Sequence, residues 1–249
     1  MIAPHPDDEA LCCAGVISTA LARGQRVHVL VMTNGGTWGV AAAALTGKPI
    51  EELASADFDA LAEARRAESV AAMKQLGLPG RELSLLGDPD NLIELYGPTP
   101  TGATPASRAP LVATLARAIA ALHPREVYAP SGADTHPGHA ATHAFVRDAL
   151  LAVHWRGQLL GYVIHSGDSA QWPWPATMTP DGGYEAHEVD GRPVPYDVVW
   201  PPPLRVPLTP DTTARKRTVI RTYASQMAIS GTFLESFVKN EEIFWPEAL

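Results

Sequence analysis

Short apolar runs alternate with helical patterns along most of this 249-residue chain. The runs are rich in Val, Ile and Leu and are bounded by Gly, Asn or Pro, which is typical of strands buried on both faces. The expected strands cover residues 27–32, 82–86, 127–129, 159–165 and 204–208. The expected helices cover residues 8–22, 57–76, 110–122, 139–153 and 211–226. This alternation predicts an α/β, Rossmann-like fold, in which a mostly parallel sheet is covered by helices on both faces.

Residues 171–203 interrupt the alternation, because Pro, Trp and Gly crowd together there and the helical periodicity disappears. We predict a Pro/Trp-rich loop or hairpin insertion over one rim of the site. The chain shows no internal repeat and no low-complexity linker, so residues 1–249 are expected to form a single domain. Only Met1 to Pro4 precede His5, so either the parallel strand before the first helix is very short or Met1 is not the native start.

Composition excludes several classes of partner. The formal net charge is −8 and no basic stripe is visible, which argues against a nucleic acid. The chain contains no apolar stretch of about 18 residues, so no membrane-spanning helix is expected. The first residues lack the pattern of a signal peptide, and a cytoplasmic location is expected. Cys12 and Cys13 are adjacent, and neighbouring helical residues point apart, so we expect two small buried residues without a disulfide. The oligomeric state stays open, with a homo-oligomer among the alternatives.

Two other functional classes lack their motifs. A dinucleotide-binding module would carry Gly-x-Gly-x-x-Gly after a strand, and none is present. A serine esterase would carry Gly-x-Ser-x-Gly, which is also absent.

The motif His5-Pro6-Asp7-Asp8-Glu9 lies where an expected strand ends and a helix begins. Ligands bind at that end of the strands in open α/β sheets. One imidazole and one carboxylate are suitable zinc ligands, so His5 and Asp8 are candidates, and Asp7 is left free as a general base. The alternative is a helix N-terminus stabilised by acids, which accounts for the two aspartates but not for His5. Glu9 is either a supporting residue behind the metal or a solvated first-turn acid.

A second polar segment, residues 134–139, follows the expected strand 127–129. Together with His5 and Asp8, His139 would complete three protein ligands and leave a fourth position for water, which is the catalytic zinc pattern. His143 is four residues further along the same expected helix, so a ligand pair of His139 and His143 is the alternative.

Two more residues are candidates for the site. Arg65 falls near the middle of the apolar stripe of the helix expected at 57–76, where it must pair or meet a ligand. Its alternatives are an ion pair with Glu68 or another acid, and contact with a substrate. His165 ends the strand expected at 159–165 and therefore points at the rim of the site.

These segments together resemble the PIG-L/LmbE-like deacetylases. The first motif is similar to the signature of that family and is the most specific part of the likeness. The remaining matches are Arg65-x-x-Glu68-x-x-x-Ala72-x-x-x-Leu76-Gly77, Leu86-Gly87-Asp88-Pro89-Asp90, His136-x-x-His139, and Lys216 with Tyr223-Ala224-Ser225-Gln226. The resemblance covers most of the chain except residues 171–203.

The resemblance implies a zinc-dependent enzyme that removes acetyl from a small-molecule sugar conjugate of the N-acetylglucosamine type. The alternative is a family member that has lost catalysis and only binds a glycan. The residue roles it implies are zinc ligation by His5, Asp8 and His139, general base catalysis by Asp7, stabilisation of the intermediate or protonation of the amine by His136, and sugar binding by Arg65 and Asp90. His165 is a further candidate sugar contact. Trp172 and Trp174 could stack on a sugar ring, and the alternatives are a hydrophobic lid or a subunit contact.

One position departs from the family pattern. The family commonly has His-Pro-Asp-His, whose Asp orients the first histidine, and Gly138 takes that place here. A glycine cannot bind an imidazole through a side chain. We therefore predict that Asp134 orients His136; the alternative is that His136 is less basic than usual.

Overall fold

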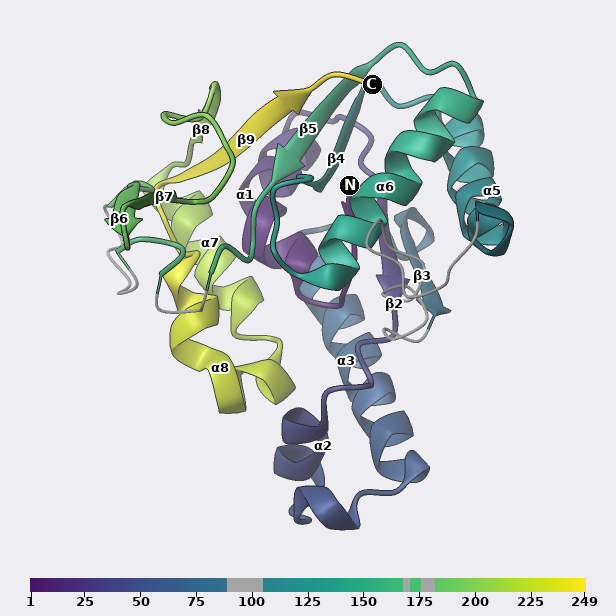
Figure 1. The fold of residues 1–249 in the computed structure, drawn as a ribbon, viewed down its shortest axis with the longest axis vertical. Helices are drawn as coiled ribbons and strands as arrows, with labels where there is room; N and C mark the ends of the chain where they lie inside the picture. Colours follow the sequence, from purple (N-terminus) through teal and green to yellow (C-terminus); the bar gives the residue numbers. More distant parts are fainter. Residues whose placement is uncertain (89–104, 168–170, 176–181) are drawn as a thin grey trace.

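The computed structural model describes residues 1–88, 105–167, 171–175 and 182–249, which form a mixed α/β fold (Figure 1). The strands are β1 (Ile2–Ala3), β2 (Val29–Thr33), β3 (Leu83–Asp88), β4 (Glu126–Pro130), β5 (Gln158–Tyr162), β6 (His187–Val189), β7 (Arg192–Val194), β8 (Leu204–Pro207) and β9 (Glu241–Glu247). The helices are α1 (Asp8–Ala22), α2 (Gly39–Thr46), α3 (Ser55–Gln75), α5 (Pro105–Leu122), α6 (Pro137–Ala152), α7 (Pro210–Ile220) and α8 (Ala224–Ser236).

The strands form two larger sheets and a hairpin. In the first sheet β1, β2 and β3 are all parallel, and in the second β4 and β5 are parallel. The second sheet continues with β9 and β8, and β9 runs antiparallel to both of its neighbours. The pairings among β1 to β5 are therefore parallel, as predicted, whereas the strand β9 and its antiparallel pairing with β5 and β8 were not predicted.

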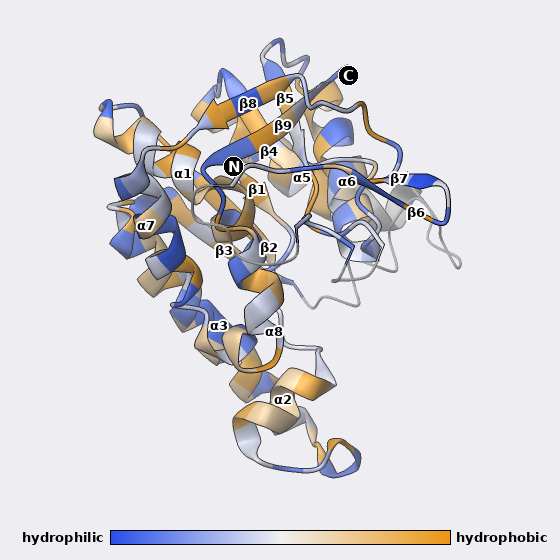
Figure 2. Ribbon diagram, turned by 90° about the vertical axis from the view of Figure 1, so that its left-hand side faces the viewer, coloured by the Kyte–Doolittle hydropathy of each residue, from blue (hydrophilic) through white to orange (hydrophobic). Residues whose placement is uncertain are grey.

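Helices cover both faces of the strands. Successive side chains of a strand point to opposite faces, and in β2 this separates two parts of the core. Val29 and Val31 pack in a cluster that includes residues of α1 and α7, and Leu30 and Met32 pack with residues of α5 and α6. Figure 1 shows α5 and α6 on one side and α1 and α7 on the other, and Figure 2 shows apolar colouring concentrated in the strands between them.

β9 is tied to α1 by one buried carboxylate. Glu242 accepts hydrogen bonds from the backbone amides of Gly15 (2.8 Å) and Val16 (2.7 Å), in the middle of α1. It also pairs with the buried Lys216 of α7 at 2.8 Å. A buried charge needs such partners, so α1, α7 and β9 are held as one unit.

Two helical regions differ from the prediction. The unpredicted α2 projects from the body beside α3 (Figures 1 and 2), where Ala41 and Ala42 pack on Leu61. Residues 211–226 are not one helix, because the chain breaks between α7 and α8 at 221–223. Tyr223 in this break is buried, and its hydroxyl donates to Glu9, so a tertiary contact overrides the helical pattern.

The insertion contains the β6–β7 hairpin. Trp172 is buried, stacks on Tyr184 and donates its indole N–H to the Val163 carbonyl, so of its alternatives the one of stacking on a sugar ring is wrong. Trp174 stacks on His187 and remains partly exposed.

The expectation for the adjacent cysteines holds only in part. Cys12 and Cys13 are buried in α1 as predicted, but a disulfide joins them, which was not expected. Within the described residues, no helix is both long and apolar enough to cross a membrane.

Candidate metal centre

The turn between β1 and α1 carries the first candidate residues. His5, Asp7 and Asp8 are all buried. The Asp8 carboxylate accepts a hydrogen bond from the His5 backbone amide at 3.0 Å, and the same oxygen lies 3.3 Å from Nδ1 of the His5 ring. Asp7 stands just before α1 with φ 135° and ψ −32°. The turn therefore directs His5 and Asp8 at one point while Asp7 has a strained backbone.

The loop after β4 brings the second set. His136 precedes α6 and its ring Nδ1 accepts from the Gly138 amide at 3.1 Å, while Pro137 occupies the first helical position. Pro is favoured there because its missing N–H is not needed. The helix then places His139 one turn inside, fully buried. This geometry points both histidines back towards the β1–α1 turn.

The two loops and the end of β5 meet in a cluster of histidines. His139 Nε2 lies 3.2 Å from Asp8 Oδ2, and the ring centroids of His5 and His139 are 5.3 Å apart. The His136 ring is 4.9 Å from His5 and 5.1 Å from His139. The His165 ring is 4.9 Å from both His136 and His139.

Two sets of donor atoms in this cluster lie within 4.8 Å of one another and could hold a metal ion. One consists of His5, His136 and His139, and the other of Asp8, His139 and His165. His139 belongs to both sets, and each contains two of the three predicted ligands.

The environment of His139 fits a metal ligand. Its Nδ1 lies 3.0 Å from the Asp134 carboxylate, which favours the proton on Nδ1 and the lone pair on Nε2. That Nε2 is buried without a hydrogen-bond partner among the described residues, and it faces an oxygen of Asp8. Burial alone would lower the pKa of His139, but the carboxylates of Asp134 and Asp8 raise it to about 10. The site therefore attracts positive charge between His139 and Asp8, which a divalent cation can supply.

The role predicted for Asp134 is corrected by the structure. Its carboxylate binds the ring of His139 and only the backbone amide of His136, at 3.0 Å. It also accepts from the amides of Ile164 and His165. Asp134 therefore does not orient the His136 ring. The backbone amide of Gly138 orients the His136 ring instead, because it donates a hydrogen bond to His136 Nδ1.

Gly138 also leaves space for the neighbouring rings. A Cβ atom at this position would lie 3.0 Å from Nε2 of His5 and 3.3 Å from Nδ1 of His136. Any side chain here would push on both imidazoles.

Arg65 pairs with Asp7 and not with Glu68. One of its nitrogens lies 3.2 Å from the Asp7 carboxylate and 2.8 Å from the Pro6 carbonyl, and another donates to the Gly35 carbonyl. Glu68 instead accepts from the amide and hydroxyl of Ser225. Burial raises the pKa of Asp7 well above its usual value, although the Arg65 charge opposes this. Asp7 is thus a buried carboxyl beside the cluster that belongs to neither candidate ligand set.

The remaining candidates are placed as follows. His143 turns away from the cluster, since its Nδ1 lies 2.9 Å from the Pro130 carbonyl and 3.4 Å from Glu247, so the alternative ligand pair does not form. His165 lies beyond the end of β5 and stacks on Phe233 of α8 with 5.6 Å between centroids. Asp90 lies outside the described residues. Phe233 was missed because nothing in the local sequence links α8 to the histidines.

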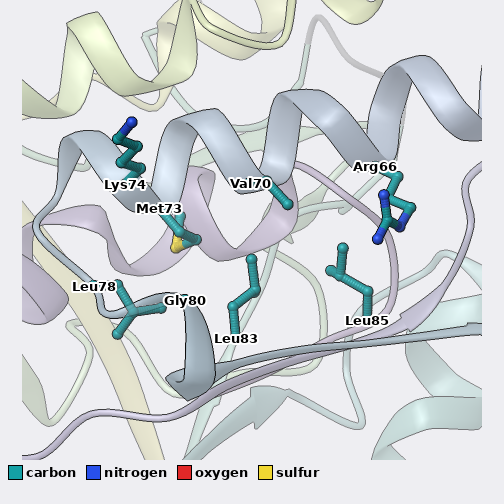
Figure 3. A pocket seen from close by; sticks show the side chains of 8 residues that line it. All are labelled: Arg66, Val70, Met73, Lys74, Leu78, Gly80, Leu83 and Leu85. Atoms are coloured by element: carbon teal, nitrogen blue, oxygen red, sulfur yellow. The ribbon is translucent and has the colours of Figure 1, made fainter.

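Two cavities lie beside α3. The larger, of about 460 Å³, is lined by Val70 and Met73 of α3 facing Leu83 and Leu85 of β3, and contains none of the clustered histidines (Figure 3). The smaller, of about 200 Å³, reaches Pro6, which connects it to the turn that carries Asp7.

Comparison with protein families gives a match over residues 1–150 to the model for PIG-L, GlcNAc-PI de-N-acetylase. The chain belongs to the PIG-L family. The matched region contains all of the candidate metal ligands and the candidate base Asp7, whereas His165, Trp172 and Trp174 lie outside it.

Individual members of the PIG-L family match the chain at about 30% sequence identity. The chain is 30% identical over 177 residues to the 1D-myo-inositol 2-acetamido-2-deoxy-alpha-D-glucopyranoside deacetylase of Mycolicibacterium vanbaalenii, covering 66% of this chain and 58% of that protein. The match therefore spans little more than half the length of that relative.

Solved structures share the fold at low identity. The N,N'-diacetylchitobiose deacetylase of Pyrococcus horikoshii has a TM-score of 0.62 at 20% identity, covering 99% of this chain and 82% of that one. GalB, the 4-carboxy-2-hydroxymuconate hydratase of Pseudomonas putida, has a TM-score of 0.59 at 16% identity, covering 95% and 80%. A hydratase on the same fold means that the fold alone does not identify the reaction.

Proposed function

We propose that this chain is a metal-dependent amidohydrolase that removes the acetyl group from an N-acetylglucosamine-type sugar conjugate and releases acetate. The observation that carries the proposal is the approach of His5 and His139 to one oxygen of Asp8, with the unligated carboxyl of Asp7 beside them. Membership of the PIG-L family and the substrate in the name of the mycobacterial relative support the same reaction.

His5, Asp8 and His139 are the proposed ligands, and zinc is the proposed metal because it favours imidazole and carboxylate donors. When bound, zinc supplies positive charge that polarises an amide carbonyl and lowers the pKa of water. Asp134 holds the His139 ring with its donor atom directed at the site.

Asp7 is the proposed general base. Its carboxylate accepts a proton from the attacking water and then returns that proton to the leaving amine. Burial favours the protonated form of Asp7, which suits a group that must take up a proton. Arg65 donates a hydrogen bond to the Asp7 carboxylate at 3.2 Å and so helps to hold it in place.

His136 is the proposed donor to the oxyanion. Its Nδ1 accepts from the Gly138 amide, so the neutral ring carries its proton on Nε2. Burial, with the surrounding histidines, lowers the pKa of His136 to about 2, which keeps the ring neutral. A neutral imidazole can donate a hydrogen bond to developing negative charge. We therefore assign protonation of the amine to Asp7 and not to His136.

Asp90 and His165 remain the proposed contacts to the sugar. The ring of His165 and the adjacent Phe233 form an aromatic wall on the side of α8. Arg65 is already bound to protein groups on two of its nitrogens, so we assign it mainly to holding the Asp7 carboxylate.

We also propose that the two sheets form one Rossmann-like layer, because β1 lies next to β4.

The test is a panel of N-acetylglucosaminides with different aglycones, including inositol and a second sugar, with acetate release as the readout. The purified protein should release acetate, lose this activity with a chelator and regain it with zinc. Release of no acetate by zinc-loaded protein from any panel member would overturn the proposal. Calorimetric binding of the same sugars without turnover would instead favour the alternative of a glycan-binding protein.

A further inference from the structure

The backbone of Asp7 needs support from its surroundings. A φ of 135° with ψ −32° is unusual for a residue that is not glycine. Such conformations cost free energy and persist only where neighbouring groups hold them. Arg65 contacts the side chain of Asp7, but a side-chain contact alone does not determine the backbone conformation.

Glu9 supplies the contact to the backbone. Its Oε2 accepts from the Asp7 amide at 3.0 Å. Its Oε1 accepts from the Ser69 hydroxyl at 2.5 Å and from the Tyr223 hydroxyl at 2.7 Å. Glu9 has no exposed surface, so the interpretation as a solvated first-turn acid is wrong.

The two hydroxyls reach Glu9 from separate elements. Ser69 lies one turn after Arg65 on α3, so the same helix contacts both the side chain of Asp7 and the residue that holds its amide. Tyr223 comes from the break between α7 and α8 and is completely buried. With three donors the carboxylate is well satisfied, and it has little freedom to move.

We propose that Glu9, fixed by Ser69 and Tyr223, is a positioning residue that keeps Asp7 in its strained conformation with the carboxyl directed at the site. The inference rests on the proposed role of Asp7 as general base. Glu9 lies behind Asp7 and its oxygens are occupied by protein donors, so it acts through Asp7 and not on the substrate. Loss of the Glu9 acceptor should let the Asp7 backbone relax and displace its carboxyl, which lowers kcat and leaves KM nearly unchanged.

The variants are Glu9→Leu, Glu9→Gln and Tyr223→Phe. Leucine is similar in size and cannot accept a hydrogen bond. Glutamine keeps one oxygen for the Asp7 amide, and its NH2 group can donate to the hydroxyl oxygens of Ser69 and Tyr223. The matched control is Tyr162→Phe, which removes another buried hydroxyl, bound to the Ile2 carbonyl at 2.9 Å.

Each variant is measured for bound metal, melting temperature, and kcat and KM of acetate release. With metal content verified, kcat should fall roughly 100-fold in Glu9→Leu, the scale of a 1 Å misplacement. It should fall about 10-fold in Tyr223→Phe, the lower end for a supporting partner. Glu9→Gln should keep a kcat much closer to that of wild type than Glu9→Leu does. Tyr162→Phe should lose a similar amount of thermal stability and keep the wild-type kcat.

Hydrogen exchange of the Asp7 amide gives a readout independent of catalysis. The amide should exchange faster in Tyr223→Phe than in wild type or Tyr162→Phe. Equal kcat in Tyr223→Phe and wild type, or equal losses in Tyr223→Phe and Tyr162→Phe, would overturn the positioning role. If wild-type protein releases no acetate, the proposed function fails, and unchanged exchange in Tyr223→Phe would separately overturn the inference.

Discussion

The Asp134 carboxylate lies 3.0 Å from Nδ1 of the His139 ring and reaches only the backbone amide of His136. Its partner is thus the proposed metal ligand and not the proposed oxyanion donor. Removal of this carboxylate should affect metal binding first.

Asp134→Ala is therefore expected to weaken zinc binding about 10- to 100-fold, the usual effect of losing the partner of a ligating histidine. Zinc affinity can be measured by competition with a chromogenic chelator. Because Ile164 and His165 also lose an acceptor for their amides, the melting temperature should fall too. Unchanged zinc affinity, with a shift in the pH–rate profile of the loaded enzyme, would return Asp134 to the role of orienting His136.

Asp7→Asn is expected to keep the metal and lose most of the activity. The amide cannot accept a proton, while the candidate metal-binding sets do not include Asp7. The measurement is acetate release by protein of verified zinc content. A loss of less than tenfold, or about 1.4 kcal/mol of barrier, would remove Asp7 from the role of general base.

His139→Ala and His143→Ala form a matched pair on one helix. His139 lies in both candidate metal-binding sets, whereas His143 contacts the Pro130 carbonyl and Glu247. We expect His139→Ala to lose stoichiometric zinc and His143→Ala to keep it, as measured by elemental analysis of dialysed protein. Zinc loss in the second variant alone would contradict the assignment.

Gly138→Ala tests whether the glycine leaves necessary space. The new Cβ would lie 3.0 Å from His5 Nε2, so the His5 ring must shift and zinc affinity should fall. Alanine favours a helix by up to about 1 kcal/mol over glycine, so thermal stability should not fall while zinc affinity does. Gly39→Ala, whose Cβ would have no neighbour nearer than 3.8 Å, is the control and should keep wild-type zinc affinity.

Lys239 is expected to make stability depend on pH. Burial lowers its pKa to about 8, below the value of about 10.4 in an unfolded chain. The unfolded state therefore binds more protons between these values, and this group's contribution should make the protein more stable as pH rises from about 8 to about 10.4. In Lys239→Met this contribution is absent, so the difference in melting temperature between wild type and variant should change across that range. A constant difference would show that the pKa of Lys239 is not lowered.

The convergence of His5, Asp8 and His139 could be predicted, because carboxyl ends of parallel strands meet at one edge of a sheet. The partner of Asp134 could not. Its carboxylate is held by amides some 30 positions away at Ile164 and His165, and the direction of a side chain in a loop depends on such contacts. Local patterns do not contain them.

Contacts between distant residues also explain where the predicted secondary structure differs from the observed fold. The break at Tyr223 interrupts a pattern that is locally helical, and its cause is a hydroxyl that binds Glu9, 214 positions earlier. β9 begins with Glu241 and Glu242, and two adjacent acids do not predict a buried strand. Glu242 can be buried because it pairs with Lys216, which is 26 positions earlier in the chain. These contacts between distant parts of the chain are properties of the assembled structure.

The bond from Glu242 to the amides of Gly15 and Val16 has a consequence for the order of folding. In a nascent chain α1 is synthesised before β9, and these two amides obtain their buried acceptor only when β9 has been synthesised. Contacts across more than 220 positions are slow to form because a long loop must close first. The packing of α1 against β9 should therefore be completed late in folding, after β9 has been synthesised.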